Sequence, residues 1–227
     1  MIRELRVGLA EGNVGTADGR VSALLVPALG THRATVTLGH GAGAGMTHRS
    51  MEAIAEAFAD VGIATLRYNF PFKEQGRSRV DAQAVSTATV AAALDCARGE
   101  SPGPHLLGGH SYGGRMASHA VVDHGLDVAG LVFCSFPLHT PAKPGTKRAE
   151  HLDGIAAPML FLSGTRDGMA QPELLNDVAT RIGATVNWLD TADHGYKVLK
   201  RTRTRTDGVF EEMAHYASAW LDAVLPA

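Results

Sequence analysis

Short apolar runs alternate with longer stretches of helical periodicity along most of this chain. After an alternating stretch at residues 3–9, runs that predict strands recur at 21–26, 36–38, 63–67, 105–107, 130–134, 158–163 and 186–189. Apolar side chains between these runs repeat every three to four positions, which predicts helices at 50–62, 81–98, 115–124, 171–181 and 209–224. Strands that alternate with helices indicate an α/β fold with a mostly parallel, doubly wound sheet of about eight strands.

The start of the chain departs from this alternation. Turn residues, and no helical pattern, separate the first two predicted strands: Gly12, Asn13, Gly15 and the pair Asp18–Gly19. An antiparallel hairpin is therefore expected to open the sheet. The polar stretch 68–77 predicts a long loop. No linker or internal repeat interrupts the pattern, so residues 1–227 are expected to form one domain.

Composition narrows the functional classes. The chain has 227 residues, 45% of them hydrophobic, with a net charge of −2 and an isoelectric point near 6.6. Such a balance predicts no binding to nucleic acid or to an anionic membrane. No stretch approaches the ~20 apolar residues that cross a bilayer, and the first residues do not resemble a signal peptide. Cys96 and Cys134 lie in apolar surroundings and are expected to stay reduced, as in a cytoplasmic protein.

One motif carries the chemistry. The predicted strand at 105–107 leads into Gly109-His110-Ser111-Tyr112-Gly113, which matches G-x-S-x-G, and a predicted helix follows. Strand, sharp turn and helix are the context of a nucleophile elbow, in which a serine sits on a strained turn. Glycines two positions before and after that serine allow the strand and the helix to approach each other.

A serine hydroxyl needs a base, and the base needs an orienting acid. In a doubly wound sheet these groups are expected just past the carboxyl ends of later strands. Asp167 follows the strand at 158–163, and His194 follows the strand at 186–189. Ser111, Asp167 and His194 are thus the predicted triad, in the chain order of α/β-hydrolases. Asp190 and Asp193 are the alternatives for the acid.

An acyl-transfer site also needs two donors for the oxyanion. The backbone N–H groups of Tyr112 and Ala42 are the predicted donors, with Gly43 as the alternative to Ala42. The glycine-rich loop at 39–45 leaves its backbone N–H groups accessible to a ligand. His40 and His110 lie near the elbow as well, but they are expected to pack or form local hydrogen bonds.

The chain as a whole resembles the small α/β-hydrolases that are grouped with the dienelactone-hydrolase-like enzymes. More narrowly, it is similar to a bacterial subfamily related to the hydrolase-like domain of a eukaryotic chromatin-complex subunit. The stretches that carry the resemblance are 40–43, 67–72, 108–115, 136–141 with Lys143 and Pro144, 164–167 and 192–197. The resemblance implies a hydrolase with this fold and triad, without a substrate. Dienelactone hydrolases proper carry cysteine at the elbow, whereas this chain has Ser111.

The residues predicted to surround the site indicate which substrates it accepts. Only residues 136–157 are available for a cap, so the site is expected to be open and to suit small or short-chain esters. The predicted substrate-binding residues are Gly43, Phe70, Phe136, Leu138 and His139. The basic run from Lys197 to Arg205 either attracts an anionic substrate or forms a solvated loop. Arg115 and Arg166 flank the triad and are expected to form local salt bridges.

Three functions remain in competition from the sequence. The first is a serine hydrolase that cleaves carboxylic esters through an acyl-enzyme. The second is a thioesterase or acyltransferase with the same triad, and the third is a non-catalytic interaction module. The expected partner is a small-molecule ester, with no cofactor and no metal, and the expected oligomeric state is a monomer or a homodimer.

Overall fold

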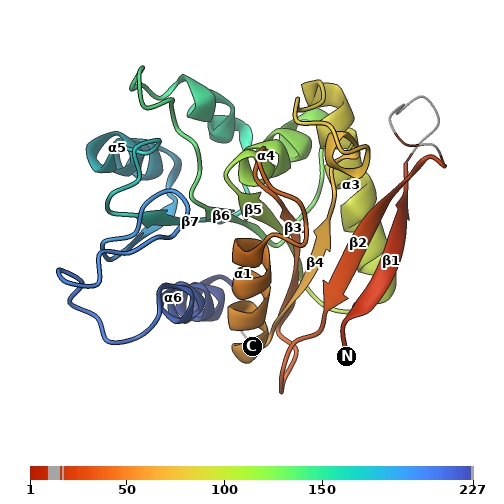
Figure 1. Cartoon of the computed structure of the whole chain (residues 1–227), viewed down its shortest axis with the longest axis horizontal. Helices are drawn as coiled ribbons and strands as arrows, with labels where there is room; N and C mark the ends of the chain where they lie inside the picture. The colour runs from red at the N-terminus through yellow and green to blue at the C-terminus, as the bar shows by residue number, and fades with distance from the viewer. Residues whose placement is uncertain (10–15, 17, 226–227) are drawn as a thin grey trace.

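A computed structural model describes residues 1–9, 16 and 18–225 of the chain (Figure 1). One mixed sheet of eight strands runs through them. The strands are β1 (Arg3–Gly8), β2 (Arg20–Val26), β3 (Ala34–Gly39), β4 (Ile63–Tyr68), β5 (His105–His110), β6 (Gly130–Cys134), β7 (Met159–Gly164) and β8 (Thr185–Leu189). The predicted strands are confirmed, and most extend by one to three residues beyond the apolar run, because flanking residues join the hydrogen-bonded ladder.

The order of the strands shows where this sheet can bind a ligand. It reads β1-β2-β4-β3-β5-β6-β7-β8. The predicted opening hairpin is confirmed, because β1 and β2 pair antiparallel, and β2 also pairs antiparallel with β4. All pairs from β4 to β8 are parallel. The chain order reverses between β3 and β5, and a crevice at the carboxyl ends of such neighbouring strands is where open α/β sheets bind ligands.

Helices cover both faces of the sheet, as predicted. They are α1 (Arg49–Asp60), α2 (Pro71–Glu74), α3 (Gln83–Glu100), α4 (Tyr112–His124), α5 (Pro172–Ile182) and α6 (Val209–Val224), with a 3₁₀ helix at Lys147–Gly154. Helices α1 and α6 share one hydrophobic core with one face of the central strands. Helices α3, α4 and α5 pack on the opposite face, in two further cores. Each central strand therefore contributes apolar side chains to both faces, as buried parallel strands do.

Two local features differ from the sequence prediction. The stretch 68–77 is not all loop: β4 continues to Tyr68, and Pro71 begins the one-turn helix α2, a position where its missing N–H costs nothing. Helix α4 begins at Tyr112, three residues before the predicted start, because it follows the elbow directly. The predicted turn residues Gly12, Asn13 and Gly15 lie outside the described residues.

Candidate active site

Ser111 sits on a strained turn at the carboxyl end of β5. Its backbone has φ 52° and ψ −112°, a conformation that non-glycine residues rarely adopt. Its N–H donates to the carbonyl oxygen of Cys134, the last residue of β6, at 2.9 Å. That hydrogen bond ties the turn to the neighbouring strand, so the structure confirms the strand–turn–helix context predicted from the motif.

Glycines beside the elbow are required by close backbone packing. A Cβ on Gly109 would lie 2.5 Å from the carbonyl oxygen of Gly39 and 2.6 Å from the carbonyl carbon of Gly113. A Cβ on Gly113 would overlap the backbone of Gly39, at the end of β3. Real Cβ atoms do not approach so closely, so strand β3, the elbow and helix α4 meet at three glycines. The packing also brings the loop after β3 next to Ser111.

The structure brings the three predicted polar side chains together. The Oγ of Ser111 lies 2.8 Å from Nε2 of His194. On the other side of the ring, Nδ1 of His194 lies 2.8 Å from Oδ2 and 3.0 Å from Oδ1 of Asp167. A carboxylate only accepts, so Nδ1 carries the proton and Nε2 is free to accept from the serine hydroxyl. The side chain of Asp167 is fully buried, whereas that of His194 is 25% exposed.

The two alternative acids have other partners. Oδ1 of Asp193 accepts from the N–H groups of Gly195 and Lys197, which closes the tight turn around the imidazole. Oδ2 of Asp190 accepts from the backbone and the hydroxyl of Thr204. Both carboxylates thus brace the loops after β8, and Asp167 alone among the three reaches Nδ1.

A second serine–histidine contact lies on α4 and lacks an acid. The hydroxyl of Ser118 donates to the carbonyl of Arg115 at 2.8 Å, and it lies 2.8 Å from Nε2 of His151. Because the hydroxyl proton is already engaged, Nε2 of His151 is the donor to Ser118. Ser118 is fully buried, and burial lowers the pKa of His151 to about 4. This pair is a packing contact and provides an internal comparison for Ser111.

The predicted oxyanion donors lie on the two segments that flank the elbow. Tyr112 is the first residue of α4, where backbone N–H groups have no partner within the helix and the helix dipole favours negative charge. Ala42 and Gly43 are exposed on the loop after β3. Within the part of the chain that the structure describes, neither the Tyr112 nor the Ala42 N–H donates a hydrogen bond.

His40 fixes the start of that loop. Its Nδ1 donates to the carbonyl of Gly41 at 2.8 Å, and its Nε2 accepts from the N–H of Phe70 at 3.1 Å. Burial lowers the pKa of this imidazole to about 4, so the ring is neutral near pH 7. The predicted local hydrogen-bonding role of His40 is confirmed.

Part of the predicted rim is wrong. Phe70 and Phe136 are fully buried: Phe70 packs edge-on against Tyr68 and Tyr112, and Phe136 packs against aromatic side chains below the end of β6. Phe70 continues the alternation of β4 into the core that Tyr68 shares. Phe136 joins the core of Phe133 instead, after the positive φ of Ser135 interrupts the alternation of β6. Leu138 and His139 are also nearly buried, yet they line a cavity of about 270 Å³ beside the 3₁₀ helix.

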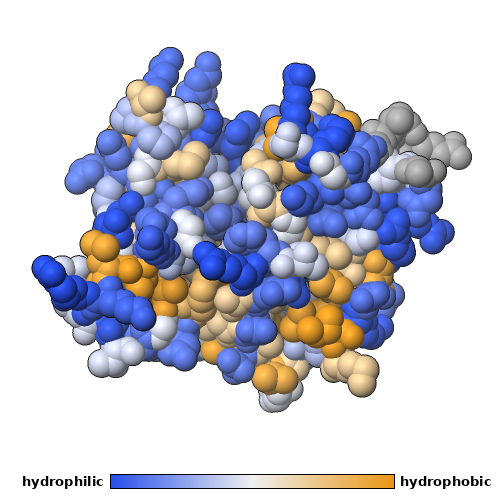
Figure 2. Space-filling model, viewed as in Figure 1, coloured by the Kyte–Doolittle hydropathy of each residue, from blue (hydrophilic) through white to orange (hydrophobic). Residues whose placement is uncertain are grey.

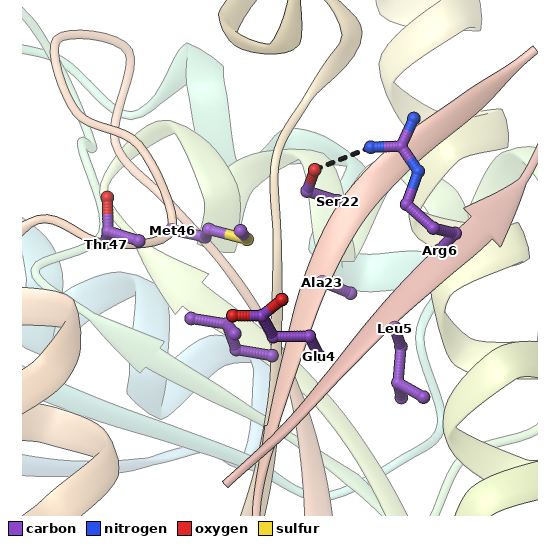
Figure 3. A pocket seen from close by; sticks show the side chains of 8 residues that line it. Glu4, Leu5, Arg6, Ser22, Ala23, Met46 and Thr47 are labelled. Atoms are coloured by element: carbon purple, nitrogen blue, oxygen red, sulfur yellow. Dashed lines mark hydrogen bonds between the residues drawn. The ribbon is translucent and has the colours of Figure 1, made fainter. Parts of the chain in front are cut away.

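Another cavity, of about 510 Å³, is lined by residues other than those of the triad. Figure 3 shows it between the β1–β2 hairpin and the loop that carries Met46 and Thr47, with the Arg6 guanidinium bonded to the Ser22 hydroxyl. No triad residue lines this cavity, and Arg6 is already paired with Glu74 and Asp18.

Arg115 and Arg166 do not form the salt bridges that the sequence predicts. Arg166 donates to the carbonyl of Thr191 at 3.1 Å and has no carboxylate partner among the described residues. Arg115 has none either, and its half-buried Nε lacks an acceptor. In the basic run, Arg203 and Arg205 are neutralised by Glu212 and Asp207. Those two arginines therefore form a structural network and not a free anion site.

None of the helices in the described residues is both long and apolar enough to cross a membrane. Within the same residues, no group of three or more His, Cys, Asp or Glu side chains is arranged to hold a metal ion.

The model of an alpha/beta hydrolase domain matches residues 32–222. Among solved structures, Est1E from Butyrivibrio proteoclasticus, with ferulic acid bound, is 14% identical, covers 98% of this chain and 100% of its own, and has a TM-score of 0.74.

Two further structures have a similar likeness. The dienelactone hydrolase from Anabaena variabilis is 18% identical, with 99% of each chain covered and a TM-score of 0.70. A serine hydrolase without lid from Xanthomonas campestris is 16% identical, covers 100% of this chain and 96% of its own, and has a TM-score of 0.69. At these identities the structures share an architecture with the present chain.

Proposed function

This chain belongs to the alpha/beta hydrolase domain family, and we propose that it is a serine hydrolase that cleaves carboxylic esters through an acyl-enzyme. The α/β-hydrolase fold without a large cap, expected from the sequence, is confirmed, as is the resemblance to small hydrolases of the dienelactone-hydrolase-like group. The observation that carries the proposal is the unbroken path of hydrogen bonds from Ser111 through His194 to the buried carboxylate of Asp167.

The proposed reaction begins with proton transfer from Ser111 to Nε2 of His194 while Oγ attacks the ester carbonyl carbon. Asp167 holds the ring in the required tautomer and stabilises the imidazolium that forms. The backbone N–H groups of Tyr112 and Ala42 then bind the oxyanion of the tetrahedral intermediate. Each such donor stabilises a transition state by about 3 kcal/mol in related chemistry.

Collapse of the intermediate completes the first half of the reaction. Nε2–H of His194 protonates the leaving alkoxide as the carbon–oxygen bond breaks, which leaves the acyl group on Ser111. His194 then takes a proton from water, the resulting hydroxide attacks the acyl carbonyl, and the same proton returns to Oγ as the acid leaves.

The short segment between β6 and β7 supports a preference for small substrates. Residues 135–158 contain a single 3₁₀ helix, Lys147–Gly154, and no inserted cap domain. A site without a cap offers little apolar surface to a long acyl chain, so we propose short-chain acyl or aryl esters as the substrates.

Labelling with a fluorophosphonate, followed by intact-mass measurement, tests the proposal. The wild-type chain should gain one adduct, and Ser111→Ala and His194→Ala should gain none while remaining folded. Ser118→Ala is the matched control, because Ser118 also contacts a histidine but lacks an acid, and its labelling should equal that of the wild type. Absence of an adduct on folded wild-type protein would reject the serine hydrolase and favour the interaction module.

A further inference from the structure

A basic cavity lies in the segment that follows β6. It measures about 270 Å³ and is lined by Leu138, His139, Thr140, Lys143, Pro144, Gly145, Lys147 and Arg148. Three of these residues are lysine or arginine, and no aspartate or glutamate is among them. Hydrophilic side chains project from this part of the molecule, at the upper left of Figure 2. The lining therefore combines a positive rim with an apolar wall.

The positive charges of this cavity are not neutralised by the protein. Among the residues that the structure describes, Lys143, Lys147 and Arg148 take part in no salt bridge. Nη1 of Arg148 donates to the carbonyl of His139 at 3.2 Å, which holds the guanidinium over the cavity wall. Arg115 of α4 does not line the cavity, and it too lacks a carboxylate partner among the described residues; burial, together with the charge of nearby Arg148, lowers its pKa. Cations gathered without a counter-charge favour an anionic ligand.

Hydrogen bonds connect the wall of the cavity to the loop that carries Asp167. The N–H of His139 donates to the carbonyl of Met169 at 3.0 Å, and the N–H of Met169 donates to Oδ1 of Asp167 at 2.8 Å. At the other end, Cys134, which accepts from the N–H of Ser111, is the last residue of β6 before this segment. The segment that lines the cavity is thus bonded to the loop of Asp167, and it directly follows the strand whose last residue is bonded to Ser111.

We propose that this cavity is a subsite for an anionic group of the substrate, a carboxylate or a phosphate, remote from the scissile ester. The inference rests on the proposed hydrolase function and names its substrate class: esters whose acyl or alcohol part carries a negative charge. The volume supports a subsite for part of a substrate, because pockets that enclose a whole drug-sized ligand span ~300–1,000 Å³.

The basic run after β8 does not provide an equivalent site. Arg203 is nearly buried against Glu212 at 2.8 Å, and Arg205 is paired with Asp207. Lys200 and Arg201 of that run are exposed and line none of the cavities described above. They provide a matched control, because removing them deletes the same charge as removing Lys143 and Lys147.

The test compares two esters of equal chain length, 4-nitrophenyl hemiadipate and 4-nitrophenyl hexanoate. The ratio of kcat/KM for the anionic ester to that for the neutral ester is measured for the wild type, Lys143→Met/Lys147→Met and Lys200→Met/Arg201→Met. We expect the first double variant to lower this ratio at least fivefold and the control to leave it within twofold of the wild type. Raising the salt concentration should lower the wild-type ratio, because exposed charges are screened.

Competition separates the two forms of the anion. Adipate and inorganic phosphate are titrated as inhibitors of hemiadipate hydrolysis, and the stronger inhibitor identifies the preferred group. A ratio that is unchanged in Lys143→Met/Lys147→Met, or equally lowered in Lys200→Met/Arg201→Met, would overturn the subsite.

Binding without turnover separates this inference from the proposed function. Adipate and phosphate are titrated calorimetrically into folded Ser111→Ala protein, with and without the Lys143→Met/Lys147→Met changes. If the wild type hydrolyses neither ester, the proposed function is rejected, and the subsite is not. Anion binding that the two lysine substitutions abolish would still support the subsite, and absence of binding would reject it.

Discussion

His110 donates a hydrogen bond from Nε2 to the backbone carbonyl of His194, at a distance of 3.0 Å. The residue directly before Ser111 therefore holds the loop that carries His194. Donation from Nε2 leaves Nδ1 unprotonated, and burial lowers the pKa of His110 to about 4, so this ring is neutral near pH 7. The two rings lie 5.5 Å apart between centroids. A position that the motif leaves open thus holds the loop of the imidazole that contacts Ser111.

Replacement of His110 tests this coupling. In His110→Asn the bond to the His194 carbonyl is lost, and we expect kcat for a neutral ester to fall about tenfold or more with KM nearly unchanged, since small misplacements of a reacting group are costly. His124→Asn, an exposed change at the far end of α4, is the control. Equal kcat in the two variants, at equal free energy of unfolding, would refute a positioning role.

The acid is tested by paired amide substitutions. Asp167→Asn keeps the shape but presents an amide to Nδ1 of His194, so kcat should fall on the order of 10³–10⁴-fold. Asp193→Asn removes a carboxylate that accepts only backbone N–H groups, and its effect on kcat should be far smaller. Steady-state kinetics on a short-chain ester measure both. A larger loss in Asp193→Asn would transfer the acid role to that residue.

The glycine junction predicts a large effect on folding. A Cβ in Gly113→Ala would overlap the Gly39 backbone, which cannot yield without moving β3, so the free energy of unfolding should drop by about 3 kcal/mol or more. Gly99→Ala meets no atom within 4 Å near the end of α3 and should stabilise by up to ~1 kcal/mol. Urea unfolding of the two variants provides the measurement, and similar stabilities would contradict the packing argument.

Buried histidines predict acid sensitivity. Burial lowers the pKa values of His40 and His110 to about 4, from an ordinary value of 6.5. Between these values the unfolded chain binds more protons than the folded one, so the stability present above pH 6.5 falls as the pH drops, and the loss is complete below pH 4. Urea unfolding between pH 7 and 4.5 should show this slope, and His110→Gln should reduce it. A slope unchanged in that variant would assign the acid sensitivity to other groups.

Acyl-chain length tests the open site. For neutral 4-nitrophenyl esters we expect kcat/KM to peak at short chains and to decline beyond them, because no cap covers a longer chain. A series from acetyl to palmitoyl esters measures the profile. A steady rise with chain length would contradict an uncovered site.

Several features of this protein follow from the sequence alone. The alternation of apolar runs and helical periodicity predicts the sheet and its helices, because each depends on local spacing of side chains. Gly109, Ser111 and Gly113 identify the elbow, since a sharp strand-to-helix turn demands those residue types within a few positions. The order of Ser111, Asp167 and His194, each just past a predicted strand, also follows from the parallel sheet.

Other features are decided only by the tertiary structure. Whether Asp167 or Asp193 reaches Nδ1 of His194 depends on the register of β7 against β8 and on the turn after β8, neither of which local sequence specifies. Phe70 and Phe136 look like rim residues in the sequence, but the packing of neighbouring strands and helices turns both into the core. The basic cavity likewise depends on the fold, because the segment after β6 packs against the loop that carries Asp167. These relationships join residues far apart along the chain, and their geometry is set by the assembled sheet.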